Sequence, residues 1–432
     1  MPFEFRRFFK ALACVGPAIR GVFPNIREAD LNSSIPLKIL MYSHDTFGLG
    51  HIRRCLAIAL SLRNCPANIL ILTGSVLAGR FQIPRRIDFV RIPGMIKVTN
   101  EQYLPLSMKL DATEVLEIRK GIILATAMAF KPDFFIVDKA PLGLKREVAD
   151  TLQWLRSDLR SCHSILGLRD VMDNADITIQ EWEEKGIYDA MEKYYDEIWV
   201  YGRRDFYDPI REYRIPPQVA SKMHFTGYIP RKIPTQEDIR AIRGELGLQN
   251  DEKLILVTIG GGGDGHPIVK TFLRAFHPSE GRLPEKTRVV IVTGPFISSR
   301  DYQEVFRIAQ SLGFTTFKFH RFMESLIGAA QLVVSMGGYN TVCEIVSQAK
   351  PFLILPRTVP REEQLIRAQV LCSQGFCDYL HPDEVNPQNL RDRVLAMLKN
   401  GSSYRRKMES FPFTGLDVIR RRILECQRKC SR

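Results

Sequence analysis

The sequence predicts an α/β protein built from two doubly wound domains in tandem. Short apolar runs alternate with helical stretches from about residue 36 onward, a pattern typical of a parallel sheet covered by helices on both faces. The alternation is interrupted at residues 227–234, where prolines and a glycine favour an extended connector, and it then starts again. We therefore expect two sheets joined by a linker. The expected parts are an N-terminal extension at 1–36, domains at 37–228 and 229–415, and a basic C-terminal tail or helix at 416–432.

Each expected strand is a short, continuous apolar run bounded by turn residues. In the first domain the runs are Lys38–Ser43, Asn68–Leu72, Ile87–Ile92, Phe134–Val137, Ser164–Leu168 and Glu197–Tyr201. In the second domain they are Leu254–Ile259, Arg288–Val292, Thr315–Lys318, Leu332–Ser335 and Phe352–Leu355. Helices are expected between most of these strands, among them Ile52–Leu62, Asn389–Leu398 and Asp417–Cys426.

The composition is that of a globular protein. Of 432 residues, 45% are hydrophobic and 25% are charged, which excludes wholesale disorder, collagen and coiled-coil arrays. The nine cysteines include no Cys-x-x-Cys pair. This spacing argues against a disulfide framework and against a zinc ribbon, and the odd number of cysteines fits a reducing compartment.

The net charge of +13 is concentrated at the two ends of the chain. Residues 1–36 carry five basic and three acidic groups, and residues 400–432 carry nine basic and three acidic groups, so the ends supply +8 of the total. No RNA-recognition signature, zinc finger or basic-aromatic ladder accompanies this charge. We therefore expect no nucleic-acid partner.

The N-terminal extension has the pattern of a basic amphipathic helix. Phe5, Phe8, Phe9 and Leu12 are spaced for one helical face, with basic residues between them, and Gly16-Pro17 ends the pattern. A helix of this kind either lies on a membrane surface or packs on the body of the protein. The apolar piece is too short to span a membrane and does not resemble a cleaved signal peptide. We expect a cytoplasmic protein, with peripheral contact to the inner face of the membrane as one alternative.

Ligands of open parallel sheets bind beyond the carboxyl ends of the strands, so glycine-rich turns after strands are candidate sites. The turn after the first strand contains Gly48 and Gly50, which allow a ligand to approach the backbone, and His51 at the start of the following helix. His51 and Asp45 are the candidate catalytic bases. Because Arg53 occupies the third-glycine position, the turn is not a dinucleotide fingerprint. The alternative is a tight turn with a capping histidine.

The second turn follows the first strand of the second domain. It contains four consecutive glycines, Gly260, Gly261, Gly262 and Gly263. Four glycines in a row carry a high conformational entropy, which a backbone that wraps a diphosphate would explain. No Gly-Lys-Ser/Thr follows, so the turn is not a Walker loop. The alternative is a surface loop without a ligand.

Two further turns complete the set. Gly337 and Gly338 open a helix whose first turn carries Asn340 and Thr341, and Glu344, one turn later, could accept hydrogen bonds from a ribose diol. After the next strand, Glu363 and Gln364 offer the adjacent acceptors and donors that suit sugar hydroxyls. Taken alone, either carboxylate could equally be solvated.

With these residues the chain resembles the GT-B glycosyltransferases, whose two Rossmann-like domains face each other across a cleft. It is most similar to family 28, which includes an N-acetylglucosaminyltransferase of peptidoglycan synthesis, and to an uncharacterised bacterial group of predicted glycosyltransferases. The resemblance covers about residues 37–400 and is most specific over Ser335–Gln364. It implies a nucleotide-diphosphate-sugar donor, most readily a UDP-sugar.

The resemblance also assigns roles to individual residues. Arg231 would face the diphosphate, Glu344 would bind the ribose, and Glu363 and Gln364 would hold the donor sugar. The family usually has two glutamines at that last pair, so the glutamate leaves the identity of the sugar open. The family's serine in the second-domain glycine loop is also missing, with Gly262 or Asp264 in its place.

The expected reaction is metal-independent transfer, with inversion, to an unidentified hydroxyl acceptor that is lipid-linked or a glycan. No Asp-x-Asp motif supports a metal-chelating mechanism, and no cofactor is expected, since the nucleotide-sugar is a substrate. The segment Gly48–Cys55 is also similar to nucleotide-sugar hydrolases of nonulosonate synthesis, so a hydrolase or an epimerase of the same fold is one alternative. A non-catalytic nucleotide-sugar-binding or membrane-recruiting protein is another.

Overall fold

The computed structural model describes residues 36–45, 50–76, 78–80, 83–97, 103–261 and 263–430. The described residues from Lys38 onward belong to one compact unit. The expected amphipathic helix at the N-terminus lies outside the described residues, as do two of the candidate glycines, Gly48 and Gly262.

Among the described residues, seven parallel strands form the sheet of an N-terminal lobe, in the order β3-β2-β1-β6-β7-β8-β9. They are β1 (Leu37–Ser43), β2 (Ala67–Thr73), β3 (Ile87–Arg91), β6 (Phe134–Asp138), β7 (His163–Arg169), β8 (Glu197–Tyr201) and β9 (Met223–Phe225). The six strands expected here are confirmed to within one or two residues. The edge strand β9 was missed because three residues are too few for a periodicity to be recognised.

A second parallel sheet forms the C-terminal lobe, in the order β12-β11-β10-β13-β14-β15 among the described residues. Its strands are β10 (Lys253–Thr258), β11 (Thr287–Val292), β12 (Thr315–Phe317), β13 (Leu332–Ser335), β14 (Phe352–Ile354) and β15 (Asp378–Tyr379). The five expected strands are confirmed, and the two-residue β15 was missed. The two sheets share no strand among the described residues, and the segment 227–234 lies between them in the chain. The expected domain boundaries stay a prediction.

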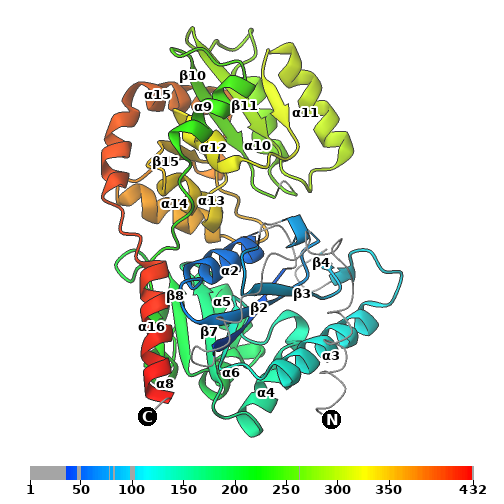
Figure 1. Ribbon diagram of the computed structural model, residues 1–432. Helices are drawn as coiled ribbons and strands as arrows, with labels where there is room; N and C mark the ends of the chain where they lie inside the picture. Colours follow the sequence, from blue (N-terminus) through cyan, green and yellow to red (C-terminus); the bar gives the residue numbers. More distant parts are fainter. Residues whose placement is uncertain are drawn as a thin grey trace, which may run out of the picture. The chain divides into compact units, whose positions relative to one another are not determined.

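Helices cover both sheets (Figure 1). Those of the N-terminal lobe are α2 (Gly50–Ser61), α3 (Ala112–Phe130), α4 (Ala149–Ser157), α5 (Ala175–Glu184), α6 (Ile187–Tyr194), α7 (Pro209–Glu212) and α8 (Pro217–Ala220). Those that follow are α9 (Gln236–Glu245), α10 (His266–Ala275), α11 (Ser299–Ser311), α12 (Met323–Ala329), α13 (Tyr339–Val346), α14 (Glu363–Ser373), α15 (Pro387–Glu409) and α16 (Gly415–Cys430). An antiparallel pair, β4 (Met95–Lys97) and β5 (Tyr103–Pro105), lies outside both sheets.

Helix α15 corrects one expectation. The sequence placed its end at Leu398, before Asn400-Gly401, which reads as a helix stop. The helix instead continues to Glu409. A Cβ at Gly401 would lie 3.0 Å from the Pro351 side chain, so this glycine allows a close approach between the helix and Pro351 and does not end the helix.

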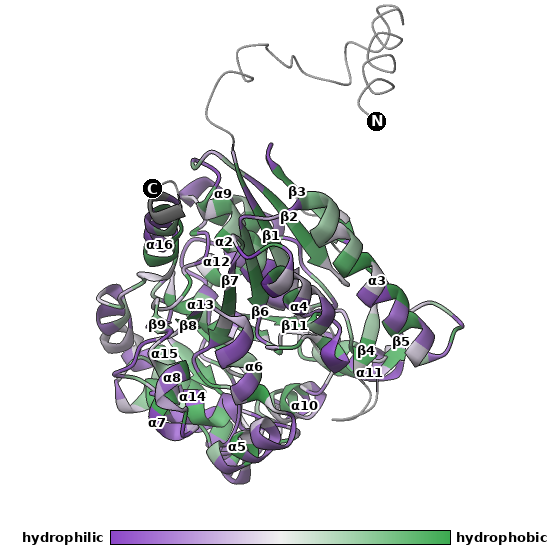
Figure 2. Cartoon of the chain, turned by 90° about the horizontal axis from the view of Figure 1, so that it is seen from below, coloured by the Kyte–Doolittle hydropathy of each residue, from purple (hydrophilic) through white to green (hydrophobic). Residues whose placement is uncertain are grey.

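The two cores explain why the strands read as apolar runs. Buried residues of each sheet pack against the helices on its faces in two separate clusters, one per lobe. The sheet around β1, β2 and β7 is accordingly mostly hydrophobic in Figure 2. Strand order reverses between β1 and β6 in one sheet and between β10 and β13 in the other. These reversal points are where doubly wound sheets bind ligands.

The closing helix α16 packs on the N-terminal lobe, beside β8 in Figure 1. Its Arg422 donates two hydrogen bonds, of 2.7 and 2.8 Å, to the buried carboxylate of Glu197 in β8. The basic C-terminal segment is therefore a packed helix up to residue 430. No helix of the described residues has the length and apolar character to cross a bilayer.

Candidate functional site

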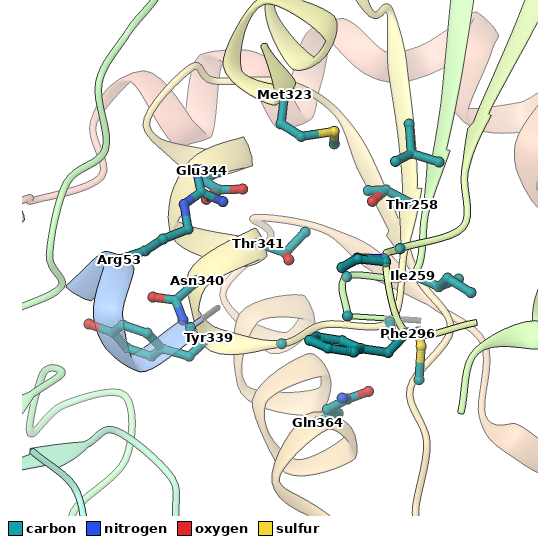
Figure 3. A pocket seen from close by; sticks show the side chains of 18 of the residues that line it. Arg53, Thr258, Ile259, Phe296, Met323, Tyr339, Asn340, Thr341, Glu344 and Gln364 are labelled. Carbon is teal, nitrogen blue, oxygen red and sulfur yellow. The ribbon is translucent and has the colours of Figure 1, made fainter. Parts of the chain in front are cut away.

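One pocket of about 270 Å³ is lined by turns from the reversal points of both sheets. Ten of the predicted site residues line it: Gly50, His51, Gly260, Gly261, Gly338, Asn340, Thr341, Glu344, Glu363 and Gln364. Four do not, namely Asp45, Arg231, Gly263 and Gly337. Figure 3 shows the labelled part of the wall, with Arg53 reaching from α2 toward Glu344 on α13.

The wall contributed by the N-terminal lobe is built around His51. The Nδ1 atom of His51 lies 2.5 Å from Oδ2 of Asp138, the last residue of β6. Arg54, one helical turn from His51, donates hydrogen bonds of 2.8 and 2.7 Å to the two oxygens of the same carboxylate. The Asp138 carboxylate is 2% exposed, so Arg54 and Asp138 form a buried ion pair, and His51 is hydrogen-bonded to the same carboxylate.

The charges of this group follow from its surroundings. The pKa of Asp138 is held below its ordinary value, because Arg54 and His51 outweigh the effect of burial. Burial lowers the pKa of His51 to about 4, although Asp138 acts in the opposite direction. A neutral His51 that donates its Nδ1 proton to Asp138 leaves Nε2 as a hydrogen-bond acceptor. The arrangement is that of a histidine base oriented by a carboxylate.

Asp45 has a different environment. Its carboxylate accepts hydrogen bonds from the Ile52 amide, at 3.2 Å, and from the Thr73 hydroxyl. Burial raises the pKa of Asp45 to about 7. The side chain thus caps the first turn of α2 below the pocket, and the geometry favours His51 over Asp45 as the group that meets a substrate.

The glycine loop after β10 supplies backbone to the opposite wall. Gly260 has a φ of +66° and Gly294, in the next loop, a φ of +84°. A Cβ on Gly294 would lie 2.4 Å from the Gly260 carbonyl oxygen, so these two loops pack with no room for a side chain. The close packing leaves Gly260 and Gly261 at the pocket surface.

The first turn of α13 forms the next part of the wall. Gly338 is its N-cap residue and makes no side-chain cap hydrogen bond, so the amides of the first turn are available to a ligand. Gly337 lies behind it, with a φ of +84° and its carbonyl accepting a 3.0 Å hydrogen bond from Arg367. A Cβ on Gly50 would come within 2.5 Å of Nδ2 of Asn340, so the two lobes approach closely at this glycine.

Arg53 links the lobes beside Glu344. Its guanidinium lies 2.6 Å from Oε1 of Glu344 and 2.7 Å from Oε1 of Glu324. The contact with Glu344 is an ion pair by distance, but Oε1 receives no hydrogen bond of good geometry and is buried. Arg231 donates to the Arg53 carbonyl, at 3.0 Å, and to Asn340, while its Nε is a buried donor without a partner.

The predicted sugar-binding pair lies at the other end of the pocket. Glu363 is 5% exposed, and its Oε2 has no hydrogen-bond partner. Arg169, at the end of β7, lies close enough that its charge lowers the pKa of Glu363 against the opposing effect of burial. Gln364 accepts a 3.3 Å hydrogen bond from the Arg357 amide. A polar ligand here would meet both a buried acceptor and a cation.

An apolar wall closes the pocket near β11 and β12. Phe296, Phe319 and Met323 line it, and both phenylalanines are exposed, at 38% and 45%. Flat exposed side chains of this kind suit a planar base. The sequence analysis missed these residues, because aromatic residues in loops carry no periodic signal.

The other missed residues are Arg53, Arg54, Asp138 and Arg169. Two of them could have been found: Asp138 and Arg169 each directly follow an expected buried strand, the position where ligand-binding residues of parallel sheets occur. Arg53 and Arg54 on α2 could not have been found in this way, because the spacing of apolar residues in a helix does not show which of two neighbouring charged side chains is buried.

Comparison with known proteins agrees with this geometry. Residues 256–419 match the glycosyltransferase family 28 C-terminal domain. Most of the C-terminal lobe is thus similar to this domain. The chain is 22% identical over 185 residues to UDP-N-acetylglucosamine--N-acetylmuramyl-(pentapeptide) pyrophosphoryl-undecaprenol N-acetylglucosamine transferase of Natranaerobius thermophilus, covering 42% of this chain and 50% of that protein. The same-named protein of Streptococcus pneumoniae serotype 19F is 25% identical over 196 residues, covering 44% of this chain and 51% of that protein. The chain thus spans about half the length of these curated relatives.

The similarity to solved structures extends beyond the residues that match the family 28 domain. MurG of Acinetobacter baumannii superimposes with a TM-score of 0.57 at 13% identity, covering 90% of this chain and all of that one. A UDP-glucosyltransferase of Polygonum tinctorium gives 0.62 at 12% identity, covering 92% of this chain and all of that one. At these identities the likeness concerns the fold, and it confirms the expected GT-B architecture of two Rossmann-like lobes.

Proposed function

We propose that the protein is an inverting glycosyltransferase that moves a sugar from a UDP-sugar to the hydroxyl of an acceptor. One observation carries this proposal: a histidine hydrogen-bonded to a buried carboxylate shares one pocket with the glycine loop and helix start of the part that matches the family 28 domain. The relatives that the chain matches are named as N-acetylglucosamine transferases with a UDP-linked donor.

The donor would lie along the wall formed by the C-terminal lobe. The uracil would pack between Phe296 and Phe319, and the ribose hydroxyls would donate to Glu344, whose Oε1 is buried without a hydrogen bond. The diphosphate would meet the first-turn amides of α13, where the helix dipole favours an anion. Arg53, which lines the pocket, would add positive charge there, and Arg231, bonded to Asn340 behind the lining, would add to it from outside the pocket.

The sugar would then extend toward Glu363 and Gln364, between the two lobes. His51 Nε2 would take the proton of the acceptor hydroxyl as its oxygen attacks the anomeric carbon from the face opposite the leaving diphosphate. Asp138 would stabilise the imidazolium that forms, as the carboxylate does in other histidine–carboxylate pairs. Donor binding would need no metal if the helix start and the arginines balance the diphosphate charge.

The acceptor and the location of the protein belong to the same proposal. The names of the curated relatives include an undecaprenol-linked acceptor, so a lipid-linked acceptor, with peripheral contact to the inner face of the membrane, is the first candidate. A soluble glycan is the other.

A titration with nucleoside diphosphates tests the donor. UDP should raise the unfolding temperature more than ADP, GDP or CDP, since a ligand at a hundred times its Kd stabilises the folded state by about 2.7 kcal/mol. A folded protein that binds none of the four would contradict the proposal.

Product analysis separates transfer from the rival activities. A transferase should release UDP quickly only when an acceptor is present. Free sugar from the UDP-sugar alone would identify a hydrolase, and conversion into another UDP-sugar would identify an epimerase. Donor binding without any turnover across a broad acceptor panel would favour the binding-protein alternative.

A further inference from the structure

A group of three metal-ligating side chains lies where helix α16 packs on the sheet of the N-terminal lobe. The side chains are His163, Glu197 and Cys426. His163 and Glu197 are the first residues of β7 and β8, and Cys426 belongs to α16, which lies beside β8 in Figure 1. The donor pocket is built from turns at the carboxyl ends of the strands. This group lies at their amino ends and is therefore separate from that pocket.

The sheet and the helix turn these residues toward one another. Glu197 pairs with Ile165 of β7, and His163 lies two residues before Ile165, so both side chains of β7 point to the same face. On α16, Arg422 lies four residues before Cys426, and residues at this spacing share one face of a helix. Because Arg422 binds Glu197, the same helix face brings Cys426 to the carboxylate.

The three ligand atoms form a nearly equilateral triangle. Cys426 Sγ lies 3.7 Å from His163 Nε2 and 3.5 Å from Glu197 Oε1. The third side, from His163 Nε2 to Glu197 Oε1, is also 3.5 Å. A tetrahedral zinc ion with its usual bond lengths to sulfur, nitrogen and oxygen separates such ligands by about 3.4–3.6 Å. The spacing is therefore that of three ligands around one ion.

Hydrogen bonds within the group explain this spacing less well. A thiol has one proton, so Cys426 can donate to only one of its two neighbours at a time. The 3.5 Å between His163 Nε2 and Glu197 Oε1 is longer than an N–H···O hydrogen bond of about 2.7–3.2 Å. The three atoms thus converge on one point without closing a hydrogen-bonded ring.

The carboxylate and the imidazole also have the outer partners that metal ligands commonly have. Glu197 Oε2 accepts hydrogen bonds from Trp199 Nε1, at 2.8 Å, and from Arg422, at 2.7 Å. Oε1 accepts another from Arg422, and because a carboxylate oxygen has two lone pairs, it can still bind an ion. On His163, Nδ1 lies 3.8 Å from Asp196 Oδ2, which favours a proton on Nδ1 and leaves the lone pair of Nε2 for a metal.

The donor atoms indicate the class of ion. One sulfur, one imidazole nitrogen and one carboxylate oxygen suit zinc and related transition metals, whereas Mg²⁺ and Ca²⁺ prefer oxygen ligands. A Cys426 thiolate and the Glu197 carboxylate offset the charge of a divalent ion, although Arg422 shares the carboxylate. The side chain of His163 is 23% exposed and Cys426 is partly exposed, so solvent reaches the group.

We propose that His163, Glu197 and Cys426 bind one Zn²⁺ ion, with water as the fourth ligand, and that the ion fastens α16 to the sheet of the N-terminal lobe. On binding, the Cys426 thiol loses its proton to the solvent. No step of the proposed glycosyl transfer passes through this ion, so the inference does not rest on the proposed function. His163 and Cys426 are 263 residues apart, which explains why no spacing in the sequence indicates the site.

Titration with Zn²⁺ alone tests the proposal. Full-length protein freed of metal by dialysis against a chelator should bind one Zn²⁺ per chain, as measured by calorimetry. Zn²⁺ should raise the unfolding temperature by mass action, whereas Mg²⁺ and Ca²⁺ should not. Co²⁺ in place of Zn²⁺ should give a thiolate-to-metal charge-transfer band in the absorption spectrum, which reports on sulfur as a ligand.

Two ligand variants locate the ion. Cys426→Ser and His163→Gln should each weaken Zn²⁺ binding at least about a hundredfold, which is more than the loss of an outer partner usually costs. Cys426→Ser should also abolish the charge-transfer band. Cys372→Ser is the matched control, because Cys372 is another partly exposed free thiol, in α14 of the C-terminal lobe. This control should bind Zn²⁺ as the wild type does.

A second control addresses the other group of metal-ligating side chains among the described residues. His266 lies near Asp301 and Glu304 in the C-terminal lobe, but that group has no thiol, and Lys270 already lies 2.6 Å from Glu304. His266→Gln should therefore leave the stoichiometry and affinity for Zn²⁺ unchanged.

A measurement on the wild type covers the case in which a ligand variant fails to fold. Zn²⁺ should protect Cys426 from alkylation by iodoacetamide and leave the reactivity of Cys372 unchanged, as quantified by mass spectrometry of the peptides. Equal alkylation of Cys426 with and without Zn²⁺ would overturn the proposal.

The remaining outcomes are equally decisive. A wild type that binds no Zn²⁺, folded ligand variants that bind it unchanged, or loss of binding in His266→Gln would each overturn the proposed site. None of these measurements depends on UDP binding or on glycosyl transfer, so the metal site and the proposed function stand or fall separately.

Discussion

Arg53 and Arg54 are neighbours on helix α2, yet they belong to two different regions of the molecule. Arg54 is 1% exposed and forms a two-bond ion pair with Asp138 inside the N-terminal lobe. It is held between the rings of Tyr201 and Tyr339, 5.6 Å from each centroid. Arg53 is 26% exposed and extends across the pocket to Glu344 and Glu324 of the other lobe.

The difference shows how one helix turn serves two purposes. Successive residues of a helix point about 100° apart, so Arg54 turns toward Asp138 and Arg53 toward the other lobe, although both line the pocket. The buried arginine fixes the charge of Asp138 and with it the orientation of His51. The exposed one forms a pair that a ligand can rearrange. The following predictions test this division, from the largest expected effect to the smallest.

Replacement of the buried arginine should have the largest effect. Arg54→Met leaves the Asp138 carboxylate buried without its cation, and we expect the free energy of unfolding to fall by about 3–5 kcal/mol. Urea denaturation measures this. Arg204→Met, at an exposed pair with Asp208, is the control and should change the value by less than about 1 kcal/mol. If both variants lost the same free energy of unfolding, the buried ion pair would contribute no more to stability than the exposed one.

His51→Ala should reduce turnover by about 10²–10⁴-fold, because it removes the proton acceptor. UDP affinity should stay close to that of the wild type, since the predicted donor contacts come mainly from the other lobe. Steady-state kinetics and calorimetry measure the two quantities. His277→Ala, at an exposed position, is the control. A folded His51→Ala protein that no longer binds UDP would mean that His51 is a donor-binding residue instead.

Glu344→Gln should weaken UDP binding by about tenfold, as for the loss of charge-assisted hydrogen bonds to the ribose. It should also abolish any preference for UDP over 2′,3′-dideoxy-UDP. Glu324→Gln removes the other partner of Arg53 and should leave UDP affinity nearly unchanged. If both variants lose affinity equally, the carboxylates act through Arg53 and not through the ribose.

The pH dependence of kcat/KM should distinguish His51 from Asp45. Because the pKa of His51 is lowered to about 4, the base form persists as the pH falls, and activity should decline only below about pH 5. An unperturbed histidine would already lose half its base form near pH 6.5. The pKa of Asp45 is raised to about 7, so a decline between pH 8 and 6 that disappears in Asp45→Asn would assign the base to Asp45.

Much of the site was predictable because the polar residues follow apolar strands in the chain. The glycine turns after the strands at Lys38–Ser43, Leu254–Ile259 and Leu332–Ser335 could be recognised without knowing how the sheets assemble. The partner of His51 could not be named so easily. Asp138 lies 87 residues from His51, and the two meet only because β1 and β6 are neighbours in the sheet.

The role that the resemblance gives to Arg231 stays a prediction. The segment that carries it was recognised, but the side chain is bonded to Asn340 and to the Arg53 carbonyl and does not line the pocket. Whether a side chain faces a ligand depends on the packing of several elements at once, and neither spacing nor family position supplies that.

The sequence by itself determined the two parallel sheets and the position of the glycine turns, since strand periodicity and glycine conformation are local properties. Only the tertiary structure decided which charges are buried together. It joined Asp138 to His51 and Arg54, and it faced Arg53 toward Glu344. The reason is that Coulombic and desolvation energies depend on distances through space, which the order of residues along the chain does not contain.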